Sequence, residues 1–270
     1  MPELPEVETV RRDLARTIVG KRVVKIDGPA SKPLSRMRGL VLVNLRRRGK
    51  YLLAKMGDEL ELIIHLGMSG RLLAAAEVPR TSHVRLVIHL EGGVLLVFVD
   101  RRRFGRVTLV TAGDYRSSPT LMRMGPEPLT DAFNRAAFER QIAGARTPIK
   151  ATLLNQRAVA GIGNIYADET LHRALIHPAR RELTSAEVGR LHKSIRTVLA
   201  AAVRHRGTSF SLHRDGLLPA GSFGRHLRVF QREGVPCLSC GTSVAKIRLG
   251  GRSTYYCPGC QVPTTECNVL

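Results

Sequence analysis

Residues 50–75 read KYLLAKMGDELELIIHLGMSGRLLAA and contain three short apolar runs that are separated by glycines and other turn residues. This pattern is typical of β-strands joined by tight connections. It continues on both sides, in RVVKI (22–26), GLVLVNL (39–45), HVRLVIHL (83–90), GVLLVFVD (93–100) and RVTLV (106–110). Because no helical pattern interrupts these strands, they favour an antiparallel β-sandwich or barrel over alternating β–α units.

The residues before the strands, MPELPEVET (1–9), predict a helix that lays its N-terminus against the β core. Leu4 precedes a proline and is pushed toward an extended conformation, whereas Pro5 suits the first turn of a helix. Val7, Val10 and Leu14 then fall on one face at helical spacing.

After GPEPLT (125–130) the apolar period becomes helical, which predicts a second, mainly α-helical part. The helical patterns lie in residues 131–144, 148–159, 164–176 and 185–205, and a loop rich in Gly and Ser follows at 207–224. We therefore expect an α+β protein with a β-sandwich domain at 1–125, a helical domain at 126–225 and a metal ribbon at 226–270.

The charge of the chain indicates a polyanionic partner. Lys and Arg total 43 against 22 Asp and Glu, which gives a formal net charge of +21. Nucleic acid is the first candidate, with a ribosome-associated protein or a merely basic surface as the alternatives. No apolar run approaches the roughly 18 residues of a membrane span, and the acidic first residues do not resemble a signal peptide. We expect an intracellular protein.

Four of the five cysteines form two Cys-x2-Cys pairs near the C-terminus. Cys237 and Cys240 are separated by sixteen residues from Cys257 and Cys260, which matches a zinc site of four thiolates. Such a site stabilises a fold and offers no open position for catalysis. A redox pair or an iron site is the alternative, and Cys267 is interpreted as a thiol without a special role.

Two further motifs each place an apolar side chain near a turn. DRRRFG (100–105) sets Phe104 beside three arginines, and HLGMSG (65–70) contains Met68. An exposed aromatic residue among arginines could wedge between base pairs, but core packing is the ordinary alternative for both side chains. The ribbon between the cysteine pairs carries three basic residues, Lys246, Arg248 and Arg252. They form either a basic tip that faces DNA or an ordinary solvated face.

GIGNIYADE (161–169) joins two helical segments through a glycine-rich turn. Backbone N–H groups and Asn164 could grip a phosphate there, at the start of a helix. Helix hairpins also use such turns for purely structural reasons, so both interpretations stand.

The N-terminus offers a nucleophile. Removal of Met1 would leave Pro2 with a secondary amine whose pKa is near 8, so an appreciable fraction is uncharged at neutral pH. Such an amine can attack C1′ of a deoxynucleoside, displace the base and become an iminium, with the neighbouring Glu3 as a candidate proton donor or electrostatic partner for the sugar. The alternative is an ordinary processed terminus.

Taken together, a series of segments in order from Pro2 to Cys260 resembles bacterial formamidopyrimidine-DNA glycosylases. The segments are MPELPEVET, RRRGKYLL, HLGMSG, DRRRFG, GPEPL, TPIK, LLNQ, VAGIGNIYADE, His177-Pro178 and RSTYYCPGC. The resemblance implies a β-sandwich, a helix-two-turn-helix domain and a zinc finger that bind damaged duplex DNA. It implies that Pro2 is the Schiff-base nucleophile, Glu3 the proton donor, Lys50 a phosphate contact that assists β-elimination, and Arg252 the δ-elimination arginine. It assigns gap filling to Met68, Arg102 and Phe104, and further DNA contacts to His83, Arg146 and Asn164.

The implied function is excision of 8-oxoguanine and formamidopyrimidines followed by strand cleavage, by a monomer in the bacterial cytoplasm and nucleoid with one Zn2+ ion. An endonuclease VIII-like enzyme for oxidised pyrimidines and a non-catalytic binder of damaged DNA are the alternatives; Leu4 argues against the first, and the set of Pro2, Glu3 and Lys50 against the second. The chain departs from the family pattern at Arg101, where proline is usual, at Ala145, and in the loop 207–224. That last departure leaves lesion preference open.

Overall fold

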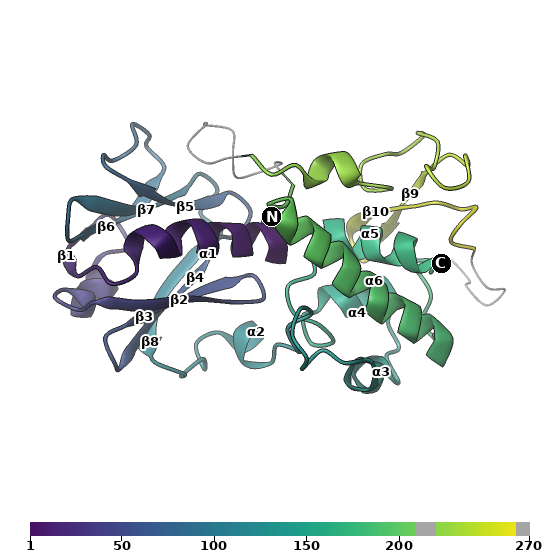
Figure 1. Cartoon of the computed structure of the whole chain (residues 1–270), viewed down its shortest axis with the longest axis horizontal. Coiled ribbons are helices and arrows are strands. Elements are labelled where there is room, and N and C mark those ends of the chain that lie inside the picture. The colour runs from purple at the N-terminus through teal and green to yellow at the C-terminus, as the bar shows by residue number, and fades with distance from the viewer. Residues whose placement is uncertain (209–219, 263–270) are drawn as a thin grey trace. The chain divides into compact units, whose positions relative to one another are not determined.

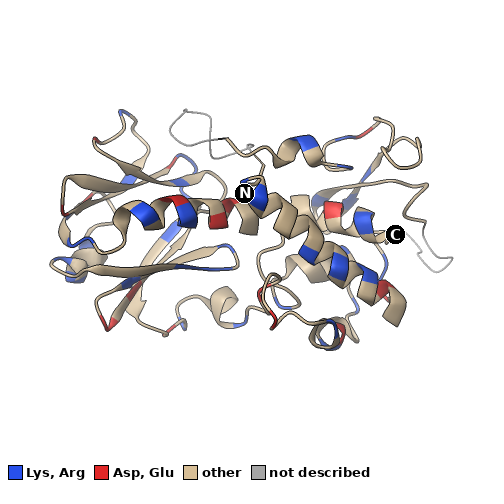
Figure 2. Ribbon diagram, in the orientation of Figure 1, with Lys and Arg blue, Asp and Glu red and all other residues tan. Residues whose placement is uncertain are grey.

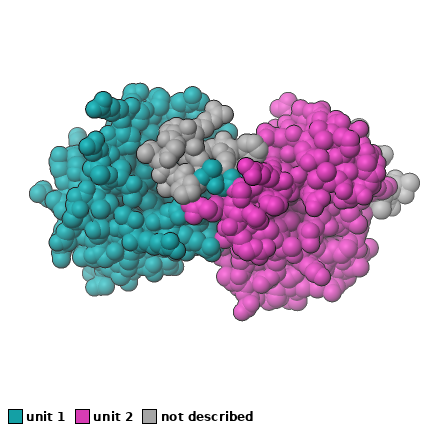
Figure 3. Space-filling view, turned by 45° about the horizontal axis from the view of Figure 1, so that its top comes forward, with its two compact units in different colours: residues 1–122, 208–221 teal, residues 123–207, 222–270 magenta. Residues whose placement is uncertain are grey.

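The computed structural model describes residues 1–208 and 220–262 (Figure 1). The chain divides into two compact units, coloured separately in Figure 3. Unit 1 comprises Met1–Met122 and Thr208–Gly221, and unit 2 comprises Arg123–Gly207 and Ser222–Leu270. Most of the loop 207–224 and the whole of Cys267 lie outside the described residues. The expected two-part α+β fold is confirmed.

Unit 1 contains two four-stranded antiparallel sheets, and every strand expected from the sequence is present in them. One sheet has the order β1-β6-β7-β5 and the other β2-β3-β4-β8. Their bounds are Val23–Asp27 (β1), Leu42–Arg48 (β2), Tyr51–Met56 (β3), Leu60–His65 (β4), Gly70–Ala75 (β5), Val84–Leu90 (β6), Val94–Asp100 (β7) and Arg106–Thr111 (β8). Short helical segments lie at Lys32–Met37 (η1) and Pro119–Met122 (α2).

Helix α1 (Leu4–Ile18) packs against strands of both sheets, among them β2 and β5. Its buried face carries Val7, Val10, Leu14 and Ile18, which join the core between the sheets. Each such side chain contributes about 1.5–3 kcal/mol when it is fully buried. The helix starts where Glu3 and Glu6 form a reciprocal capping box.

Unit 2 combines four α-helices with a two-stranded ribbon among its described residues. They are Arg135–Ile142 (α3), Ile149–Leu154 (α4), Asn164–Ala174 (α5), Ser185–Arg204 (α6), Ala245–Leu249 (β9) and Arg252–Tyr256 (β10), with a 3-10 turn at Phe223–His226 (η2). The helices enclose a core that includes Phe133, Phe138 and Tyr166. None of the helices in the described part of the chain is long and apolar enough to cross a membrane.

Candidate functional site

The first residues of the chain are held in a buried hydrogen-bond network. Pro2 is buried, and Glu3 is only 2% exposed. The Glu3 backbone N–H donates to Glu6 Oε2 at 2.9 Å. Glu6 Oε1 in turn accepts hydrogen bonds from the backbone N–H and the hydroxyl of Thr208, at 2.8 and 3.1 Å. Sequence reasoning missed Glu6 and Thr208, because their contact joins residues that are far apart along the chain.

Charged groups surround the amino terminus. Burial lowers the pKa of the Met1 amino group; Glu3 and Glu6 oppose this shift, whereas Lys50 and Arg102 add to it. The structure therefore brings Glu3, Lys50 and Arg102 within electrostatic range of the amino terminus. An amine at this position is more often unprotonated, and hence nucleophilic, than an exposed one.

Lys50 sits in the tight turn between β2 and β3 and is only 7% exposed. The same surroundings hold His65, whose pKa is lowered to about 4 by burial and by the charges of Lys50 and Arg106. His65 is therefore neutral near pH 7, and its Nδ1 accepts a hydrogen bond from the Gly67 N–H at 3.2 Å. Its proton consequently resides on Nε2.

Two turns that carry predicted gap-filling residues meet in unit 1. We call residues 65–70 the methionine loop and residues 100–105 the finger turn. Met68 is 42% exposed and Phe104 52% exposed, so the alternative interpretation of both as core residues is wrong. The Arg102 guanidinium lies 4.9 Å from the centre of the Phe104 ring. The three predicted gap-filling side chains thus come from two turns packed together.

A buried carboxylate that sequence reasoning missed organises these turns. Asp100 Oδ1 accepts hydrogen bonds from the Ser69 hydroxyl at 2.6 Å and from the Arg102 N–H at 3.2 Å. Asp100 Oδ2 accepts one from the Gly105 N–H at 2.7 Å. The Asp100 N–H donates to the carbonyl of His83, a half-buried residue among the predicted DNA contacts. In DRRRFG the aspartate looked like a flanking residue.

In unit 2, the predicted phosphate-binding asparagine is joined to the zinc ribbon. Asn164 is the first residue of α5, and its Nδ2 donates to the carbonyl of Ser253 at 2.9 Å. Arg252 immediately precedes Ser253 and is exposed at the start of β10. Arg146 is exposed between α3 and α4.

A buried ion pair supports the same junction. Lys150 Nζ lies 2.7 Å from Asp168 Oδ1 and also donates to the Thr254 hydroxyl at 2.8 Å. Asp168 Oδ2 accepts a hydrogen bond from the Tyr255 N–H at 3.0 Å. Burial raises the pKa of Asp168 to about 7, although Lys150 opposes the shift. The pair fixes β10, the strand that starts at Arg252, against α4 and α5.

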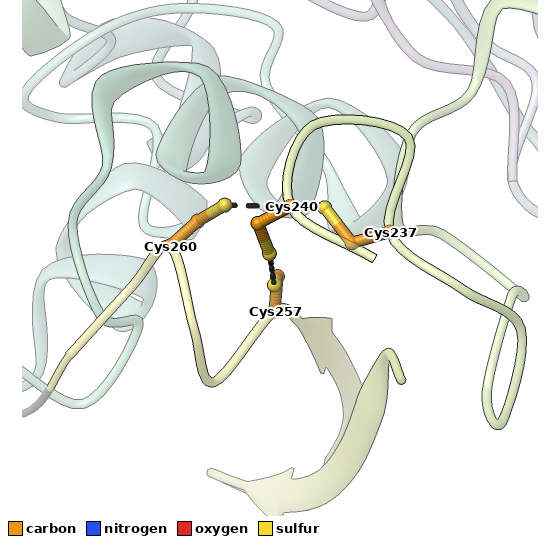
Figure 4. A group of neighbouring side chains, drawn as sticks. All are labelled: Cys237, Cys240, Cys257 and Cys260. Carbon is orange, nitrogen blue, oxygen red and sulfur yellow. Dashed lines mark hydrogen bonds between the residues drawn. The ribbon is translucent and has the colours of Figure 1, made fainter. Parts of the chain in front are cut away.

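The four predicted zinc ligands converge at one end of the ribbon, before the start of β9 and after the end of β10 (Figure 4). Their sulfur atoms all lie within 4.8 Å of one another, with 3.9 Å between Cys237 and Cys260 and 3.4 Å between Cys240 and Cys257. Four thiolates that each lie about 2.3 Å from a central zinc ion would be separated by about 3.8 Å. The cluster therefore fits a tetrahedral zinc site.

Lys and Arg residues are distributed over both units (Figure 2), including a series along α6. Glu8 accepts hydrogen bonds from Arg11, Arg12 and Arg47. The excess of positive charge is thus available to a polyanion.

Three family descriptions match the chain in succession. The formamidopyrimidine-DNA glycosylase N-terminal domain matches residues 1–107, the formamidopyrimidine-DNA glycosylase H2TH domain residues 124–213, and a zinc finger found in FPG and IleRS residues 234–262. The third match and the cysteine geometry agree, and the ribbon holds one structural Zn2+ ion.

Curated proteins and solved structures are similar over nearly the whole chain. A formamidopyrimidine-DNA glycosylase from Desulforamulus reducens is 43% identical over 97% of this chain and 99% of its own length. One from Symbiobacterium thermophilum is 46% identical, over 97% and 89%. The crystal structure of MutM (FPG) from Thermus thermophilus matches with a TM-score of 0.89 and 41% identity, over 97% of this chain and 100% of that one. A complex of Lactococcus lactis Fpg with DNA containing an abasic site matches with a TM-score of 0.89 and 34% identity, over the same shares.

Proposed function

The chain belongs to the formamidopyrimidine-DNA glycosylase family, and we propose that it excises oxidised purines from duplex DNA and then nicks the strand at the abasic site. Similar solved structures include MutM in complex with DNA containing carbocyclic 8-oxo-G. The observation in this chain that carries the proposal is the burial of Pro2 and Glu3, next to an amino terminus on which Glu3, Lys50 and Arg102 act electrostatically. A protein that only binds DNA has no need of such an amine.

The proposed reaction starts at the Pro2 nitrogen after Met1 has been removed. The nitrogen forms a bond to C1′ of the damaged nucleotide while the bond from C1′ to the base breaks, and the base leaves with that electron pair and takes up a proton. The nitrogen, positively charged after the attack, gives up its proton; the sugar ring then opens as its oxygen, protonated by Glu3, leaves C1′, and the lone pair freed on the nitrogen completes the iminium. Loss of a C2′ proton then breaks the C3′–O bond, and δ-elimination breaks the C5′–O bond. Lys50 and Arg252 are proposed to hold the phosphates concerned.

Recognition is proposed to rest on the remaining predicted contacts. Met68, Arg102 and Phe104 fill the space that the flipped nucleotide leaves, which offsets part of the cost of unstacking. His83, Arg146 and Asn164 position the DNA through its backbone. We further propose domain boundaries at 125/126 and 225/226, which limited proteolysis would test, and action as a monomer in the cytoplasm on the DNA of a bacterial nucleoid.

The zinc ion is structural in this scheme. Cys237, Cys240, Cys257 and Cys260 would hold it, and a site with four thiolates leaves no position for a reacting water. Its contribution is to fold the ribbon that carries Arg252.

The test uses duplexes that differ only in one base, either 8-oxoguanine or an oxidised pyrimidine, with borohydride present. We expect cleavage of the purine lesion and a covalent adduct in the wild type, and loss of the adduct in Pro2→Gly. Pro33→Gly, an exposed proline in η1, is the matched control. Intact mass should show that Met1 is absent from active protein.

Other results would change the assignment. Preference for the pyrimidine lesion would favour an endonuclease VIII-like enzyme, and the absence of any adduct, even on an abasic site, would leave a DNA-binding protein. Retained Met1 in a fully active preparation would remove Pro2 as the nucleophile.

A further inference from the structure

Asp100 occupies the point where three predicted DNA-contacting segments of unit 1 meet. It ends β7 and is only 2% exposed. Its backbone N–H binds the carbonyl of His83, and its side chain binds Ser69 of the methionine loop and both Arg102 and Gly105 of the finger turn. A buried carboxylate with partners in all three segments is more than a surface charge.

The two carboxylate oxygens act on different parts of this junction. Oδ1 binds the Ser69 hydroxyl and the Arg102 N–H, and the Ser69 oxygen itself accepts the Arg102 N–H at 3.0 Å. This triangle joins the two turns. Oδ2 binds the Gly105 N–H and so closes the finger turn at its far end. Hydrogen bonds from N–H and O–H donors to an ionised acceptor are the stronger kind.

The turns also approach each other too closely for a side chain at Gly67. A Cβ on Gly67 would lie 2.5 Å from the Phe104 carbonyl carbon, and a Cβ on Gly105 would lie 3.2 Å from the His65 carbonyl oxygen. The backbones of the methionine loop and the finger turn are therefore in direct contact. Movement of one turn would displace the other.

The finger turn needs this support because its own sequence does not impose its shape. Arg103 has a φ of +58°, a conformation that disfavours residues with a Cβ. Arg101 stands where proline would fix the backbone, and Arg101, Arg102 and Arg103 are all exposed and repel one another. The buried carboxylate is the neighbouring group that offsets both effects.

We infer that Asp100, with Ser69 as its link, is the positioning residue that holds Met68, Arg102 and Phe104 as one gap-filling tip. This inference rests on the proposed function for the reaction that the tip serves. Asp100 touches neither the base nor the sugar in this assignment. It acts by fixing the two turns before DNA arrives, so that little ordering cost remains at binding.

The first experiment observes gap filling without chemistry. A duplex carries an uncleavable tetrahydrofuran residue opposite 2-aminopurine, whose fluorescence rises when its stacking is disturbed. At saturating protein, we expect Asp100→Asn to reduce the fluorescence change of the wild type by at least about half, because an amide nitrogen cannot accept from an N–H. Asp114→Asn, at a half-buried aspartate of unit 1 paired with Arg116, controls for the change in net charge.

The second experiment separates positioning from general damage. Excision of 8-oxoguanine should fall about tenfold in Asp100→Asn, whereas cleavage of a ready-made abasic site, which has no base to displace, should stay within about threefold. Ser69→Ala should lower excision in the same selective way, and Ser69→Thr, which retains the hydroxyl, should restore it. The serine pair keeps the test valid even if Asp100→Asn does not fold.

Two results would overturn the inference. One is that both Asp100→Asn and Ser69→Ala give the same fluorescence change and the same excision rate as the wild type. The other is an equal loss on lesion and abasic substrates that Ser69→Thr does not restore, which would show a merely structural role. If the wild type itself excises no lesion, the proposed function fails, but the fluorescence change still decides the role of Asp100.

Discussion

His65 shows how one residue in this structure makes stability depend on pH. Its folded pKa of about 4 lies below the ordinary histidine value of 6.5, because burial and the neighbouring charges of Lys50 and Arg106 disfavour the charged ring. Between these two values the unfolded chain binds a proton that the folded chain does not. Above pH 6.5 His65 is neutral in both states and does not reduce the free energy of unfolding. As the pH falls from 6.5 toward 4, protonation of the unfolded chain lowers the free energy of unfolding.

We predict that the free energy of unfolding decreases by up to about 3 kcal/mol from this source between pH 6.5 and 4. Urea denaturation at half-unit steps of pH measures it. In His65→Asn, whose side-chain oxygen can still accept the Gly67 N–H, the slope in this window should become shallower. An unchanged slope would show that other groups cause it.

At the scale of single residues, the sequence predicted candidate catalytic residues better than the residues that hold them in position. Pro2 and Glu3 could be singled out because a terminal amine and a neighbouring acid have roles that their types suggest, whereas Lys50 was identified through the family resemblance. Asp100, Ser69 and Glu6 could not, because their roles depend on partners 31 to 202 residues away. Nothing in a local pattern reveals that a given carboxylate will be buried against N–H groups.

Among the elements, the methionine loop is sensitive to an added methyl group. Gly67 has a φ of +63° and its Cβ would meet the Phe104 backbone, whereas Gly113 has a φ of +83° and faces open space. Gly67→Ala and Gly113→Ala should therefore share the conformational cost of about 1 kcal/mol, but Gly67→Ala should lose about 1–3 kcal/mol more through overpacking. Denaturation midpoints would show the difference, and equal losses would mean that the turns can move apart.

The zinc ribbon makes a second prediction for an element. Cys237→Ser should reduce bound zinc from one ion per chain to nearly none and weaken DNA binding strongly, because the metal supplies the folding energy of such small ribbons. Elemental analysis and binding to duplex DNA measure both effects. Cys267→Ser should keep the zinc. Full zinc occupancy in Cys237→Ser would require a different ligand set.

The strands and helices themselves were predictable because period and turn residues are local properties. All eight strand patterns and all five helix patterns became elements of the expected type. The short η1 and α2 were not expected, since a single turn leaves no periodic signal. The hydrogen bond from Thr208 to Glu6, at the start of α1, could not be predicted from the sequence either, because only the tertiary fold brings the two residues together.

For the whole molecule, the net charge of +21 predicts a steep dependence of DNA affinity on salt. If 6–10 phosphates are neutralised, affinity should fall roughly 10³–10⁵-fold between 50 and 200 mM salt. Arg252→Ala should reduce the slope of log affinity against log salt by about 1. Arg116→Ala, an exposed arginine already paired with Asp114, should leave the slope unchanged. Equal slopes for wild type and Arg252→Ala would remove Arg252 from the phosphate contacts.

Lesion preference is the whole-molecule property that the sequence predicted least. The loop 207–224 departs from the family pattern, and its residues 209–219 lie outside the described ones. The activity assay on the two lesions therefore decides this point, and the fold does not.

The hydrogen bonds from Thr208 to Glu6 span 202 residues, so they can form only late in the synthesis of the chain. At about 5–20 residues per second, a ribosome needs roughly 10–40 s after Glu6 emerges before Thr208 can reach it. During that interval the start of α1 lacks one of its partners, and the first residues stay open to the peptidase that would remove Met1. The topology thus leaves time for the terminus to be processed before its surroundings are complete, and makes the start of α1 one of the last parts of the chain to gain all its partners.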